Sequence, residues 1–145
     1  MAVGAWKIAK VVAKTLFAAL FIAGGVAHFV TPETYMKIMP DYLPYHRELV
    51  LLSGVFEVAL GVLLLIPRTS RLAAWGLIAL LVAVFPANVE MYRHAERFSI
   101  PPALLLLRLP LQGLLILWAY AYTRRSRVEG DRPRGASRST DDGRN

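Results

Sequence analysis

Four long apolar runs, separated by short polar connections, dominate the chain up to residue 122. None alternates apolar and polar residues as a β-strand would, and each approaches the roughly 20 residues that a helix needs to cross a bilayer core. Pro67 ends the second run because proline cannot continue the helical hydrogen-bond ladder, and Pro86 and Pro110 fall inside the later runs. The pattern predicts an all-α integral membrane four-helix bundle over residues 1–122, with spans at about 11–30, 49–66, 72–92 and 103–122.

The connection between the first two spans, residues 31–48, and the C-terminal segment, residues 123–145, lead to different structural predictions. In residues 31–48, Thr31 can cap and Pro32 can open a short helix. Its tyrosines suit the headgroup zone of a membrane, where a ring is buried and a hydroxyl stays wet. We therefore expect a short interfacial helix here, the alternative being a plain loop. Residues 123–145 carry almost no large apolar side chain, which predicts a disordered basic cytoplasmic tail.

Composition removes several classes of function. Of the 145 residues, 56% are hydrophobic and 19% charged, whereas an ordinary soluble domain has roughly 45–50% apolar residues. A soluble enzyme is therefore not expected. The absence of cysteine excludes disulfides, thiolate metal sites and any thiol relay.

The net charge of +7 acts mainly as a topology signal. With four spans, twelve basic residues fall on the side of the two termini and four on the other side, and Arg108 lies inside the fourth span. Basic residues concentrate on the cytoplasmic side of membrane proteins. We expect both termini in the cytoplasm and no role in binding nucleic acid.

Polar residues inside the spans carry the functional hypothesis. A charge at mid-bilayer costs about 2.5–3.5 kcal/mol even on lenient scales, so such residues face the bundle and mark sites. Counted from the exoplasmic end of each span at about 1.5 Å per residue, the principal ones all lie in the outer half of the membrane. This agreement predicts one outward-facing ligand-binding pocket. Its residues are His28, Glu57, Asn88, Arg108 and Gln112.

Glu57 and Arg108 differ little in estimated depth, and we expect them to form a buried ion pair. This pair has two interpretations, a structural clasp between helices or part of a ligand or proton site. No second histidine or cysteine lies at ligand spacing from His28, so no metal site is predicted.

The same residues carry a family resemblance. The segments resemble the DoxX-like family of small four-helix membrane proteins, and the similarity covers about residues 10 to 122. The matching segments are residues 25–29, Pro32, residues 43–44, residues 53–57 with Gly61 and Pro67, residues 85–88 and residues 108–112. The resemblance implies a multi-pass protein of the bacterial cytoplasmic membrane. It implies function only broadly, since the family is named for a subunit of a thiosulfate:quinone oxidoreductase.

Three functions follow from this pattern. The first is binding of a small amphipathic or redox lipid, such as a quinone, beside a membrane oxidoreductase system. No heme, flavin or iron–sulfur motif is visible, so quinone is the one cofactor considered, and catalysis by the chain alone is not expected. The second is a non-catalytic assembly or stabilising partner of another membrane protein, and the third is a small proton-coupled transporter. The sequence leaves a homo-oligomer open.

Overall fold

The computed structural model describes residues 2–124 of the 145, and within that range it is all-helical. Four helices are long and apolar enough to cross a membrane, which confirms the prediction of a multi-pass helical bundle. The predicted tail falls on residues 123–145, of which 125–145 lie outside the described residues. The elements are α1 (Ala2–Val30), α2 (Pro32–Met36), α3 (His46–Leu65), α4 (Ser70–Arg93), the short 3-10 helix η1 (Ala95–Arg97) and α5 (Pro102–Ala121).

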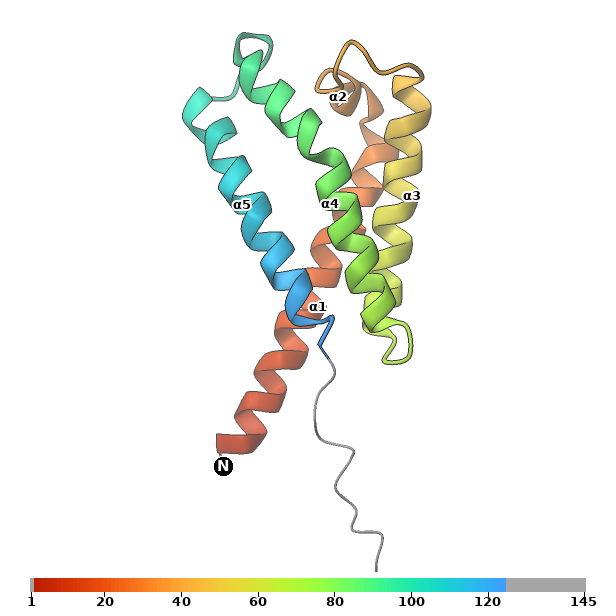
Figure 1. The fold of residues 1–145 in the computed structure, drawn as a ribbon, viewed down its shortest axis with the longest axis vertical. Coiled ribbons are helices and arrows are strands. Elements are labelled where there is room, and N and C mark those ends of the chain that lie inside the picture. The colour runs from red at the N-terminus through yellow and green to blue at the C-terminus, as the bar shows by residue number, and fades with distance from the viewer. Residues whose placement is uncertain (1, 125–145) are drawn as a thin grey trace, which may run out of the picture.

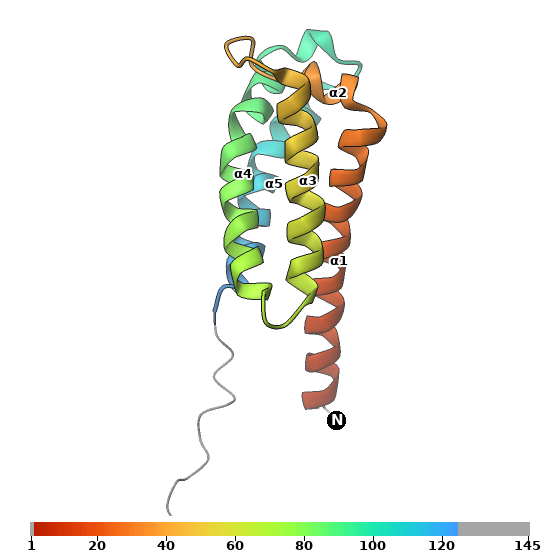
Figure 2. The same ribbon diagram turned by 90° about the vertical axis from the view of Figure 1, so that its right-hand side faces the viewer.

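Three of the long helices begin and end within three residues of their predicted spans, but α1 is longer. It begins at Ala2 rather than near Val11. The segment before Val11 is rich in alanine and lysine, residues that favour helix whether or not they are in lipid. Hydropathy finds the apolar part of this helix and misses its polar start. Figure 2 shows this part of α1 extending beyond the other helices.

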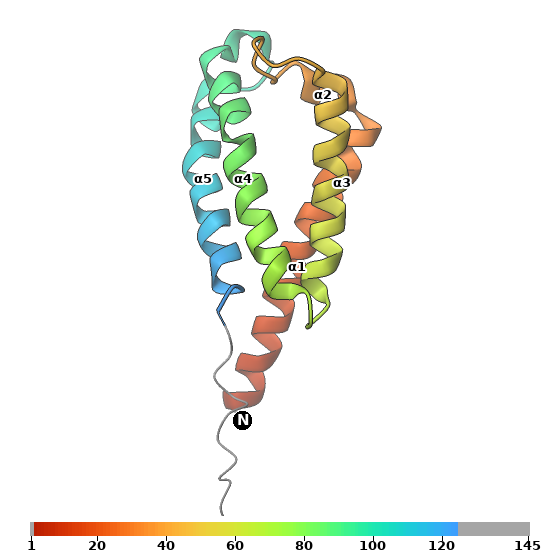
Figure 3. The ribbon, with the colours of Figure 1, turned by 45° about the vertical axis from the view of Figure 1, so that its right-hand side comes forward.

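The helices pack in chain order, α1 on α3, α3 on α4 and α4 on α5. The fourth side of the ring is different, because α5 and α1 barely touch along their length. Figures 1 and 3 show that α1 with α3 and α4 with α5 form two pairs that diverge toward α2. Both ends of the described chain lie at the opposite end of the bundle, which we call the closed end.

A buried apolar cluster fills the closed end. Phe17 of α1 is fully buried, and its ring contacts Trp118 and Tyr122 at centroid distances of 4.7 and 5.9 Å. Leu77 of α4 and Ala119 of α5 complete the contact between the two pairs. In lipid, helices associate through close packing rather than through loss of water contact. This cluster therefore joins the two pairs where they converge.

Small residues set the spacing of α1 and α3. Gly25 and Gly54 face each other so closely that a Cβ built on Gly25 would lie 2.7 Å from the carbonyl oxygen of Gly54. One built on Gly61 would lie 3.1 Å from the carbonyl oxygen of Ala18, about two turns further along. Such contacts between small residues let helix backbones approach in membranes. The pair α1–α3 is thus held at backbone contact.

The first connection folds back over the end of the bundle opposite the closed end. The expected short helix is present as α2, but Thr31 does not cap it, because its hydroxyl donates to the carbonyl of Ala27 instead. Tyr45 precedes α3 in a left-handed conformation with φ 58°, which is uncommon for a residue other than glycine. His46 then donates from Nε2 to the carbonyl of Pro40 at 3.1 Å. This bond closes the loop between α2 and α3.

Candidate functional site

A pocket of about 700 Å³ opens between the diverging helix pairs beneath α2. Its volume falls within the range of about 300–1,000 Å³ that is usual for small-molecule sites. All four long helices and the α2–α3 connection contribute to its wall, which is mainly apolar. The apolar residues include Leu20 and Phe21 of α1, Leu49, Leu52 and Phe56 of α3, Leu80 and Val84 of α4, and Leu111 and Leu115 of α5.

The structure brings all five sequence-predicted residues to this one pocket. They come from four different helices, one or two from each, and they lie on both sides of the space between the pairs. His28 and Glu57 belong to the α1–α3 side, whereas Asn88, Arg108 and Gln112 belong to the α4–α5 side. Depth along each span, estimated from sequence, therefore identified a set of side chains that share a cavity.

Glu57 lies at the contact between α1 and α3. Its Oε1 is 3.8 Å from Nε2 of His28, close enough for electrostatic attraction but too long for a hydrogen bond. Gly24 leaves room for the same carboxylate, because a Cβ at that position would lie 3.0 Å from Oε2 of Glu57. The helix spacing and the histidine together hold the Glu57 side chain against α1.

His28 is fixed on three sides. Its Nδ1 lies 2.9 Å from the carbonyl oxygen of Val50, and since a carbonyl only accepts, this nitrogen carries a proton. The ring of Tyr35 lies against the imidazole with 3.9 Å between centroids. Nε2 is left facing Glu57. The histidine thus connects α2, α3 and the pocket.

The predicted ion pair between Glu57 and Arg108 does not form. Arg108 instead donates from Nη1 to Sδ of Met91 at 3.6 Å, and the side chain within 4.0 Å of the Glu57 carboxylate is the imidazole of His28. The physical reason is the divergence of the two helix pairs, which puts the pocket between α3 and α5. The estimated depth in the membrane is similar for Glu57 and Arg108. It does not show which neighbouring helix each side chain faces.

Gln112 joins α4 to α5 at the floor of the pocket. It is buried, with 3% of its surface exposed, and its Nε2 donates to the carbonyl of Leu81. Its Oε1 accepts a hydrogen bond from Nδ2 of Asn88 at 2.9 Å. Pro86, nearby in α4, lacks the backbone N–H that a helix uses at that position. Asn88 and Gln112 therefore have a structural role between α4 and α5 in addition to lining the pocket.

Three polar residues of the pocket, Tyr35, Tyr42 and Ser53, were not among the predicted site residues. Tyr35 lines the pocket from α2, and no periodicity in the sequence shows that this short helix folds back over the bundle. Ser53 also lines it, and its buried hydroxyl has no hydrogen-bond partner among residues 2–124. Ser53 was detectable, because it lies four residues before Glu57 and so on the same helix face.

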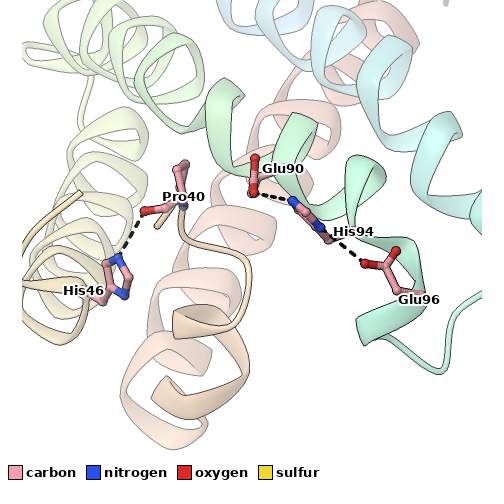
Figure 4. Close-up of polar contacts among 5 residues, drawn as sticks. All are labelled: Pro40, His46, Glu90, His94 and Glu96. Carbon is pink, nitrogen blue, oxygen red and sulfur yellow. Dashed lines mark hydrogen bonds and ion pairs between the residues drawn. The ribbon is translucent and has the colours of Figure 1, made fainter. Parts of the chain in front are cut away.

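Three polar contacts made by His46 and His94 lie near the α2 end of the bundle (Figure 4). His46 contacts Pro40 as described, and His94 lies between Glu90 and Glu96, with nitrogen–oxygen distances of 2.8 and 3.3 Å. A hydrogen bond from its own backbone, followed by the bond from His94, holds the pKa of the Glu96 carboxyl below its ordinary value. This cluster fastens the turn between α4 and α5.

Metal ligation finds no support in the described part of the chain, where no group of three or more histidine or acidic side chains could hold an ion. Comparison with known proteins gives one result for the chain. No curated protein and no solved structure matches it. A family model described as a domain of unknown function (DUF8561) matches residues 17–123, from the buried Phe17 to the residue after α5 and its C-cap. The chain therefore belongs to the DUF8561 family.

Proposed function

We propose that this protein binds a small amphipathic lipid, with the polar head in the pocket and the apolar part along its hydrophobic wall. One observation carries the proposal: five predicted polar side chains from four helices converge in a cavity whose wall is mainly apolar. Ligand sites commonly combine an apolar wall with a few convergent polar groups. Ionisable residues within membrane spans also mark functional sites more often than they serve packing alone.

A redox lipid of the quinone type is one member of this class. The carbonyls of such a head can accept hydrogen bonds from Arg108, while its ring packs against an aromatic residue such as Phe56. The resemblance to DoxX-like proteins supports a place beside a membrane oxidoreductase system. In this role the chain binds and positions the lipid, and electron transfer belongs to a partner.

The seam between α1 and α5, where the two helices make few contacts with each other, supports a lipid rather than a water-soluble compound. A tail can leave the pocket sideways there without passing the loops at either end. Leu20 on α1 and Leu111 on α5 are exposed residues that line the pocket at this side. Such a route keeps the tail in hydrocarbon while the head stays among polar groups.

Lipid analysis of the purified protein tests this proposal. We expect the wild type, extracted from native membranes, to retain an amphipathic lipid at near one molecule per chain by mass spectrometry. Arg108→Gln should lose it, whereas Arg71→Gln, a matched change outside the pocket, should retain it. Equal lipid content in both variants and in the wild type would contradict the proposal and favour the role of an assembly partner.

The proposal places the protein in the bacterial cytoplasmic membrane with both termini on the cytoplasmic side. An even number of spans puts both described ends at the closed end (Figure 1). Lys7 and Lys10 near the start of α1, and Arg68 and Arg71 at the connection from α3 to α4, belong to the same side in this chain order. Basic residues favour the cytoplasmic side. A reporter that is active only outside the cytoplasm should be silent when fused after residue 124 and active when inserted between α2 and α3; the reverse result would invert the topology.

A further inference from the structure

One acidic and one basic side chain face the same pocket without being joined to each other. Glu57 belongs to the α1–α3 wall and Arg108 to the α4–α5 wall, and they are not within ion-pair distance. The guanidinium carries five N–H donors, yet its contact in the structure is a thioether sulfur, Sδ of Met91, which is a weak acceptor. Among residues 2–124 no carboxylate lies within 4.0 Å of it. Its side chain is exposed and contributes to the lining of the pocket.

Tyr35 shows that both charges act on one compartment. The pKa of its phenol is raised by burial and then by the charge of Glu57, and lowered by the charge of Arg108. Its ring also lies on His28, which is next to Glu57. A single side chain of α2 therefore lies near both groups, and all three residues line the same pocket.

Separated charges of this kind are unfavourable in a membrane unless something neutralises each of them. In low dielectric the penalty for an unpaired charge is high, and bidentate contacts of arginine with phosphate or carboxylate are among the strongest available. Carboxylates in turn accept charge-assisted hydrogen bonds from primary ammonium groups. A molecule that carries both an anionic group and a primary ammonium can bind Arg108 on one wall and Glu57 on the other at the same time.

We propose that the pocket recognises a zwitterion, with its phosphate or carboxylate at Arg108 and its primary ammonium at Glu57. This inference rests on the proposed lipid-binding function and defines the head group that the function selects. The apolar wall and the α1–α5 seam favour the head group of a phospholipid, such as phosphoethanolamine, over a free soluble zwitterion. A neutral quinone head offers no charge to Arg108 or to Glu57.

The test compares how tightly the full-length protein binds lipids with different head groups. The protein is reconstituted in phosphatidylcholine nanodiscs, and native mass spectrometry follows binding of phosphatidylethanolamine, phosphatidylglycerol and a quinone, and of free phosphoethanolamine. We expect the ethanolamine lipid to bind about tenfold or more tightly than either the glycerol or the choline lipid, the factor for one charge-assisted hydrogen bond. Equal binding of the three phospholipids by the wild type would overturn the inference.

Variants of Glu57 and Arg108 test the ammonium contact and the phosphate contact separately. Glu57→Gln should lower affinity for the ethanolamine lipid to that for the glycerol lipid, whereas Arg108→Gln should weaken binding of both. Arg108→Lys keeps a positive charge and should retain most of the preference, and Arg71→Gln serves as the matched control with unchanged binding. Melting temperatures of all variants separate loss of binding from loss of folding. A preference that survives in Glu57→Gln would contradict the ammonium contact.

The remaining outcomes distinguish recognition of a zwitterion from the proposed binding of a lipid. Tight binding of free phosphoethanolamine would support the zwitterion and assign it to a soluble compound. Binding of the quinone without any phospholipid preference would overturn the zwitterion and leave the lipid-binding function intact. Failure of every amphiphile to bind would overturn both.

Discussion

Substitution of Gly25 by alanine should destabilise the bundle. The new Cβ would lie 2.7 Å from the carbonyl oxygen of Gly54 and 2.8 Å from Cγ2 of Val58, closer than the 3.0 Å below which Cβ atoms are essentially never found. The first of these atoms is backbone and cannot rotate away, so α1 and α3 must separate. Overpacking of a tight contact costs about 1–3 kcal/mol. We therefore expect the folded-to-unfolded ratio to fall about five- to 150-fold.

Gly113→Ala supplies the matched control. Gly113 is also within a helix, but a Cβ there meets nothing within 4 Å. Alanine should be neutral or stabilising at this position, by up to about 1 kcal/mol, because it favours helix over glycine. Unfolding in mixed detergent micelles, followed by circular dichroism, measures both variants under the same conditions. The difference between them isolates the helix contact from helix propensity.

The double variant sharpens the same prediction. A Cβ on Gly54 would in turn lie 2.8 Å from the carbonyl oxygen of Gly25. Once the first alanine has separated the helices, the second should cost less than it does alone, because neighbouring sites are not additive. Two refuting results are clear. One is that Gly25→Ala and Gly113→Ala have equal stability, and the other is that the Gly25 and Gly54 effects add fully.

Two further predictions concern packing inside the bundle. Gln112→Leu should lower the free energy of unfolding by about 1–3 kcal/mol, because it leaves the partly buried Asn88 amide without its acceptor; a stability equal to wild type in the same micelle assay would argue against a structural role for this hydrogen bond. Leu77→Ala should cost about 1–2 kcal/mol, the cavity part of such a change, since lipid is as apolar as leucine and little transfer energy is lost. Leu72→Ala is its control, because Leu72 is 74% exposed and Leu77 0%; similar effects at both positions would show that the core cluster has been misplaced.

Hydropathy alone was enough for the four helices because a membrane leaves few alternatives. With no water to satisfy backbone groups, an apolar run of this length becomes a helix whatever its neighbours are. The convergence of polar residues was also accessible, since Asn88 and Gln112 had to share a level in the membrane before they could share a hydrogen bond. Both inferences use only position along the membrane normal.

The sequence does not show which way each side chain points around the axis of its helix. Glu57 faces α1 because Gly24 and Gly25 let that helix come close, and Arg108 faces Met91, a partner that a search for opposite charge overlooks. The role of Tyr35 depends on how α2 folds back, which is set by a loop rather than by a repeat. The expected ion pair was wrong for this reason, although both of its members lie in the pocket.

The seam between α1 and α5 determines how a ligand would be supplied. A molecule that enters sideways comes from the surrounding bilayer, where it is confined to a thin sheet and held at a fixed orientation. Occupancy then depends on the mole fraction of that lipid in the membrane, and dilution of the aqueous phase leaves it unchanged. The protein would register membrane composition itself, and a change in the lipid mixture would alter its occupancy without any soluble messenger.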